Sequence, residues 1–180
     1  MIGYRFNGHQ TRVVPRRELL ETIFNKPGGH PEYAAGGSAY DYSREVSYHK
    51  MEITSHIVDW IDLPQTEKYY AGGVMGVDKG SRVAEAIEFA LNYVDRNKLI
   101  DFREFDRNGD EYVDVFSVVH SGYGAEFPSV DLDGVSDADR IWSHQSDIPI
   151  WTSRGSQIRV SDYAMSTAFQ DTSGPSPTGI

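Results

Sequence analysis

The chain reads DFREFDRNGDEYVDVFSVVHSGYGAE from Asp101 to Glu126, where an oxygen-rich loop leads into an apolar segment and then into a glycine-rich turn. The apolar residues between Val113 and His120 are nearly continuous rather than alternating with polar ones. A run of this kind is typical of a strand that is buried on both faces of a sheet. This part of the sequence therefore predicts a core strand with polar segments at both of its ends.

Side chains that carry oxygen recur at alternate positions in the loop before this strand. The positions that supply ligands in a helix-loop-helix calcium site are filled, in chain order, by Asp106, Asn108, Asp110, the main-chain carbonyl of Tyr112, and Asp114. Glu111 and Ser117 stand at the sixth and twelfth positions, where such a site has glycine and a bidentate glutamate. Two hypotheses follow: a structural calcium site, or a solvated loop of Asx turns without an ion.

Composition limits the classes of protein that this chain can belong to. Its 180 residues are 39% hydrophobic and 12% aromatic, which is enough to bury the core of one folded domain. The formal net charge of −10 argues against a nucleic-acid partner, because binding to phosphates needs clustered Lys and Arg. The absence of cysteine excludes disulfides and thiolate zinc sites.

No segment is long and apolar enough for a membrane helix, which needs about 18 consecutive apolar residues. The N-terminal residues also lack the apolar core of a signal peptide. If the protein is exported, we expect its signal to lie upstream of Met1.

The spacing of apolar and turn-forming residues predicts the remaining elements. A stripe of apolar residues indicates a long helix over 79–97, with Ser81 as its cap, and a shorter helix is expected over 16–24. Strands are expected as two neighbours within 41–60, at 141–143 and at 158–164. The fold class that results is α/β (α+β), a twisted mixed sheet with the long helix packed on it. We divide the chain into an N-terminal segment with a short helix and a loop (1–40), a main subdomain (41–170) and an irregular tail (171–180).

Several blocks of sequence, in a fixed order, carry a resemblance to a known family. They are DYSREVSY at 41–48 with MEI at 51–53, Trp60 with LP at 63–64, YYAG at 69–72, DF at 101–102 with FD at 105–106 and GD at 109–110, YVD at 112–114, VH at 119–120 with GYG at 122–124, and IWSH at 141–144. In this respect the chain resembles the immune inhibitor A family of secreted zinc metallopeptidases from about Asp41 onward.

The resemblance implies the N-terminal subdomain of a zincin-like metallopeptidase, with a sheet that offers an edge strand to an extended peptide or protein substrate. It also implies secretion, calcium that rigidifies the loop, and zinc held by an HExxH helix shortly downstream of the matched part. Relatives usually have glycine where Glu111 stands. None of the six histidines forms an HExxH motif, so we carry over no zinc ligand and no catalytic base.

Two interpretations of the missing motif stay open. In the first, the chain is the N-terminal portion of a zinc metalloendopeptidase, and this portion is expected to be inactive by itself. In the second, it is a catalytically inactive relative with a peptidase-like fold, a calcium-stabilised structural or adhesion component of a larger extracellular assembly.

Three residues are candidates for contact with a substrate. His120, Tyr123 and His144 stand at the ends of expected strands, where an imidazole can donate a hydrogen bond to a peptide carbonyl. The alternative is that both histidines are structural and that Tyr123 belongs to a plain turn. A second acidic stretch at 131–139 could be another cation loop, but its spacing fits no loop pattern and solvated surface explains it as well.

Overall fold

A computed structural model describes residues 1–126 and 134–169 of the chain. Its elements, in chain order, are β1 (Ile2–Arg5), α1 (Arg17–Asn25), α2 (Ala39–Val46), β2 (Val58–Asp62), α3 (Glu67–Ala71), α4 (Val83–Arg96), the 3₁₀ helix η1 (Phe102–Phe105), β3 (Ser117–Tyr123), the 3₁₀ helix η2 (Asp137–Asp139), β4 (His144–Thr152) and β5 (Arg159–Phe169). The tail 171–180 and residues 131–133 of the second acidic stretch lie outside the described residues.

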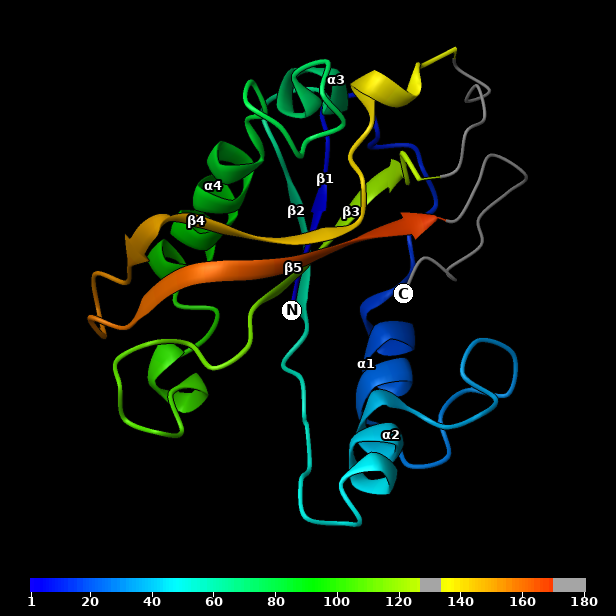
Figure 1. The fold of residues 1–180 in the computed structure, drawn as a ribbon, viewed down its shortest axis with the longest axis vertical. Coiled ribbons are helices and arrows are strands. Elements are labelled where there is room, and N and C mark those ends of the chain that lie inside the picture. The colour runs from blue at the N-terminus through cyan, green and yellow to red at the C-terminus, as the bar shows by residue number, and fades with distance from the viewer. Residues whose placement is uncertain (127–133, 170–180) are drawn as a thin grey trace.

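The strands form one mixed sheet in the order β2-β1-β3-β5-β4 (Figure 1). Neighbouring strands run parallel except for β4, which is antiparallel to β5 and lies at one edge. This arrangement confirms the predicted α/β fold with a mixed sheet. β3, the strand expected at 113–120, occupies the centre of the sheet and starts four residues later than predicted, at Ser117.

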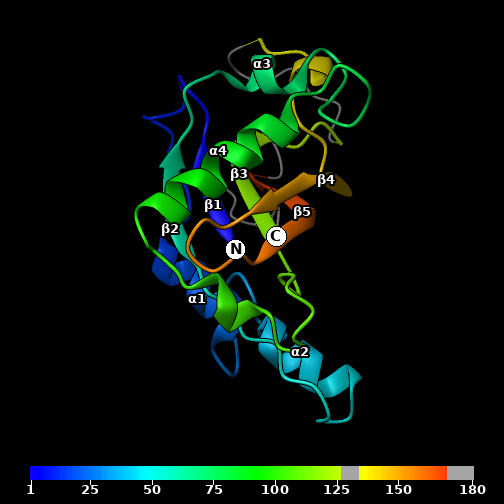
Figure 2. The ribbon, with the colours of Figure 1, turned by 90° about the vertical axis from the view of Figure 1, so that its left-hand side faces the viewer.

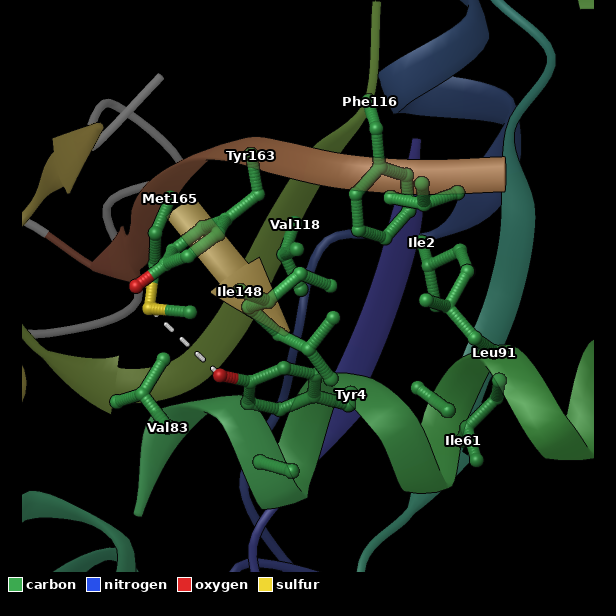
Figure 3. Packing of buried hydrophobic residues seen from close by; sticks show 14 of the residues in the cluster. Ile2, Tyr4, Ile61, Val83, Leu91, Phe116, Val118, Ile148, Tyr163 and Met165 are labelled. Atoms are coloured by element: carbon green, nitrogen blue, oxygen red, sulfur yellow. Dashed lines mark hydrogen bonds between the residues drawn. The ribbon is translucent and has the colours of Figure 1, made fainter. Parts of the chain in front are cut away.

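The long helix α4 packs across one face of the sheet, as Figures 1 and 2 show. Its buried stripe consists of Val83, Ala86, Ile87, Ala90, Leu91 and Val94. Opposite this stripe, Tyr4 and Val118 project from the central strands, and the Tyr4 hydroxyl donates to the Met165 sulfur at 3.6 Å (Figure 3). Burial of one Leu or Ile side chain contributes about 2 kcal/mol to the stability of the folded state. The buried stripe of α4 therefore stabilises the fold substantially.

The predicted helices at 16–24 and 79–97 are confirmed as α1 and α4. The cap of α4 differs in detail from the prediction. Arg82 is the N-cap and makes no side-chain cap bond, while the Ser81 hydroxyl oxygen accepts from the Val83 N–H at 3.2 Å. Ser81 therefore still satisfies one N–H group in the first turn of the helix.

The prediction of two strands within 41–60 is wrong. Residues 39–46 form α2, because the Ser38 side chain accepts from the Asp41 N–H while the Asp41 carboxylate accepts from the Ser38 N–H, a capping box that starts a helix. Tyr48 and His49 then adopt left-handed backbone angles, φ 53° and 62°, which end it. Only β2 is a strand in this region. α1 and α2 pack against each other beside the sheet (Figure 1).

Two strands differ from the sequence prediction at the other end of the chain. The segment 141–143 is not a strand, since Ile141 makes only an isolated bridge to Gly124 and β4 begins at His144. The strand predicted at 158–164 is confirmed as β5, which extends to Phe169. β1 was not predicted at all, although it lies between β2 and β3.

In the described ranges, no helix is both long enough and apolar enough to cross a bilayer.

Candidate functional site

The strand β4 forms an open edge of the sheet. One side of it pairs with β5, from His144 opposite Met165 to Thr152 opposite Arg159, and the register shifts between Asp147 and Trp151. Among the described residues no strand pairs with the other side. An edge with unpaired N–H and C=O groups is a template on which an extended peptide can add as a further strand.

The side chains of β4 divide between the core and the solvent. Ile148 and Trp151 are buried, at 7% exposure each, and anchor the strand to the hydrophobic core. Asp147 and Pro149 are exposed, and Ile150 is 60% exposed. Pro149 has no N–H group, so it interrupts the donors along the strand and limits edge-to-edge association of the free protein.

His144 stands at the start of β4 with both of its ring nitrogens engaged. Nδ1 lies 2.6 Å from the Trp142 carbonyl oxygen, and Nε2 lies 2.7 Å from the Tyr163 hydroxyl. A carbonyl only accepts, so Nδ1 carries the proton and Nε2 accepts from Tyr163. Burial raises the pKa of Tyr163 to about 12, which keeps its hydroxyl protonated as the donor. These bonds fix the ring, which is partly exposed, at one end of the edge strand.

His120 lies inside the protein, with no exposed surface. Burial lowers its pKa to about 3, and the neighbouring cationic side chains, His9 first among them, act in the same direction. The neutral ring accepts the Gly122 N–H on Nδ1 at 3.2 Å. In this arrangement His120 has no surface through which it can contact a substrate.

Tyr123 is the third candidate and ends β3. Its side chain is partly buried and its ring packs against that of Phe169, with the centroids 5.5 Å apart. The Arg12 guanidinium lies over the Tyr123 ring, 4.8 Å from the centroid. Tyr123 and His144 therefore retain exposed surface, whereas His120 does not.

A buried acid near His120 was not singled out from the sequence. Glu67, at the start of α3, is 5% exposed, and its carboxylate lies 3.8 Å from His9 Nε2 and 4.0 Å from His120 Nδ1. The Glu67 carboxylate also lies close to the backbone of Gly122. A Cβ added at Gly122 would clash with this carboxylate. Glu67, His9 and His120 are separated by more than 50 residues along the chain, so no spacing in the sequence could have indicated this cluster.

The oxygen-rich loop is closed by hydrogen bonds from its own main chain. Asp106 Oδ1 accepts from the N–H groups of Gly109 and Asp110 at 2.7 and 3.1 Å, and Oδ2 accepts from the Glu111 N–H at 3.0 Å. Asp114 Oδ2 accepts from the Arg107 N–H at 3.0 Å. These are the Asx-type turns that the sequence offered as the alternative to calcium.

Four of the five predicted calcium ligands face one hollow of about 350 Å³. It is lined by Asn108, Asp110, Tyr112, Val113, Asp114, Ser161 and Asp162. Its oxygens suit a hard cation in kind. However, within residues 1–126 and 134–169 no three acidic or histidine side chains converge as a metal site would require. The loop residues would have to reorient before they could surround an ion.

Glu111 adopts φ +68°, in the left-handed region that favours glycine. Its carboxylate pairs with Arg159 of β5, and its carbonyl accepts from the Arg159 N–H at 2.8 Å. The sharp turn is thus made without glycine and is tied to the sheet by Arg159.

Both aspartates in the described part of the second acidic stretch, residues 134–139, form ion pairs. Asp139 pairs with Lys68 at 2.9 Å, and Asp137 lies 3.5 Å from the guanidinium of Arg140. The Asp139–Lys68 pair connects η2 to α3, whereas Arg140, the partner of Asp137, is the C-cap of η2 itself.

Comparison with known proteins assigns the chain to a family. The family model described as the catalytic domain of the immune inhibitor A peptidase M6 matches residues 21–172, which is most of the chain. No curated protein matches the sequence. An open antiparallel edge strand beside a central parallel sheet is an arrangement that can hold an extended polypeptide, as a peptidase requires. The chain belongs to the immune inhibitor A family of M6 peptidases.

Proposed function

We propose that this chain forms the substrate-docking scaffold of a secreted zinc metalloendopeptidase that hydrolyses peptide bonds in protein substrates. The family match supports a metallopeptidase type of function. The observation that carries the docking role is the open edge of β4, which pairs with β5 on one side only among the described strands. Secretion is proposed from the resemblance to the family, and membership of a larger extracellular assembly belongs to the alternative of a catalytically inactive structural or adhesion component.

The catalytic metal is not assigned to residues of this chain. The six histidines form no HExxH motif, and the described residues offer no cluster that could hold zinc. The role proposed for these residues is to support and orient a bound polypeptide, with His144, at the start of β4, as the group that contacts it. Tyr123 ends β3, which β5 separates from β4, so it can contact only a part of the substrate that continues beyond this edge. His120 is buried and can act only as structural support.

Docking on β4 has a direct test in hydrogen exchange. Addition of a saturating extended peptide should slow exchange of main-chain amides in β4, because the new strand takes up N–H groups that water reaches in the free protein. Amides of β2, at the opposite edge of the sheet, serve as the internal control and should not change. Protection that appears on β2 but not on β4 would contradict the proposal.

We also propose that the loop binds calcium through Asp106, Asn108, Asp110, Asp114 and the Tyr112 carbonyl. Support comes from their spacing and from the hollow that four of these residues line. Calcium would replace the main-chain N–H groups as the partners of the carboxylates and so would hold the loop rigid ahead of β3.

Calcium titration of the intact chain should release or absorb heat and raise the melting temperature, because an ion that binds only the folded state stabilises it. Asp110→Asn removes one carboxylate from the hollow and should weaken binding about tenfold or more. Glu111→Gly should retain binding, since glycine suits the φ of this position. An unchanged melting temperature and no heat would leave only the Asx-turn interpretation.

A further inference from the structure

The outer strands of the sheet bring two aspartates directly opposite each other. Asp147 of β4 pairs in register with Asp162 of β5, and both residues are exposed. Directly opposed residues of antiparallel strands share a face, with their Cβ atoms about 4.5–5.5 Å apart. Like charges in such a pair repel each other and destabilise the sheet.

No cation of the described residues offsets this repulsion. Neither aspartate forms an ion pair within residues 1–126 and 134–169, and the only side-chain hydrogen bond of Asp162 there is with its neighbour Ser161, whose hydroxyl donates at 3.1 Å. The nearest basic residue along β5, Arg159, is committed to Glu111 and to the ring of Tyr112, 4.4 Å away. The local charge therefore remains negative.

The same side of the sheet carries further negative charge. Asp162 also lines the hollow that contains Asp110 and Asp114. Ile148, the next residue after Asp147, is buried, which is consistent with Asp147 pointing to the face away from the core. The formal net charge of the whole chain is −10, so distant charges add to the negative electrostatic potential around Asp147 and Asp162 and do not cancel it.

We propose that β4 selects extended peptides with a lysine or arginine at the residue that pairs with Asp147. This inference rests on the docking role of β4 proposed above and adds the chemical class of the ligand. A peptide strand on the open edge would place one side chain beside Asp147 on the same face. A basic side chain at this position of the peptide can pair with Asp147 and extend toward Asp162. Its positive charge would reduce the repulsion between the two carboxylates.

The test compares two labelled eight-residue peptides that differ only in a central lysine or glutamine. Their dissociation constants for the intact chain are measured by fluorescence anisotropy, in a chelator and at low salt. The lysine peptide should bind more tightly by up to about fivefold, the upper end of what an exposed ion pair contributes. The advantage should shrink at high salt, because solvent-exposed charges are screened.

Asp147→Asn should abolish this preference, whereas Asp59→Asn, which makes the same charge change on β2 at the opposite edge, should keep it. In the absence of peptide, Asp147→Asn should also raise the urea midpoint, because it removes one of two like charges. A lower midpoint would overturn the inference, since the pair would then not be repulsive.

Equal affinity of the wild type for both peptides would also overturn the proposed preference for a basic side chain. If the β4 amides are protected from exchange in that case, docking on β4 stands. If neither peptide binds and no amide of β4 is protected, the docking role itself fails, and the inference fails with it.

Discussion

Replacement of Gly72 by alanine is expected to destabilise the protein by about 3 kcal/mol, through backbone strain combined with a steric clash. Gly72 is the C-cap of α3 and adopts φ +67°. A Cβ at this position would lie 2.8 Å from the carbonyl carbon of Gly80 and closer still to its oxygen. Because the obstacle is main chain, it cannot rotate away, and the segment that leads into α4 would have to move.

The neighbouring Gly73 provides a matched control. It adopts φ +74°, but a Cβ added there would have no other atom within 4 Å. Gly73→Ala should therefore carry only the conformational cost of about 1 kcal/mol. Urea unfolding of both variants measures the difference, and equal costs would show that the approach of Gly72 to Gly80 does not constrain the chain.

Acidification is expected to destabilise the fold through His120. Its pKa is about 3 in the folded protein, lowered by burial, against an ordinary value of 6.5. Between these values the unfolded chain binds a proton that the folded protein does not, so stability rises with pH. The contribution of His120 is thus fully present above pH 6.5 and is lost as the pH falls, by about 1.4 kcal/mol for each pH unit.

Carboxylates with lowered pKa values, such as Asp41 and Asp101, also lose stabilising interactions in acid, so the wild-type curve alone does not isolate His120. His120→Gln isolates it, because an amide does not titrate and its oxygen can still accept the Gly122 N–H. Unfolding free energies measured from about pH 7 to about pH 4.5 should fall less steeply for this variant. Parallel curves for the two proteins would rule out the buried imidazole as the cause.

Local sequence patterns were sufficient to predict an element wherever burial imposes one simple pattern of apolar residues on it. The stripe of α4 follows from the helical period, and the apolar run before His120 follows from burial on both faces of a central strand. The capping box of Ser38 and Asp41 was also present in the sequence, but the β-forming residues after it favoured a strand. β1 has only four residues, and β4 is largely exposed, so neither shows a clear period.

The long helix and the spacing of oxygens in the loop could be predicted from the amino-acid sequence, because each depends on residues close together in the chain. The fold class and the family could be predicted because the expected elements and the blocks of sequence follow one another in a recognisable order. The folded structure alone shows which residues far apart in the chain meet. It buried His120 beside Glu67 and paired Asp147 with Asp162 on an open edge. Strand order and register are set by the packing of the whole core, and no local pattern encodes which strand edge remains open to a partner.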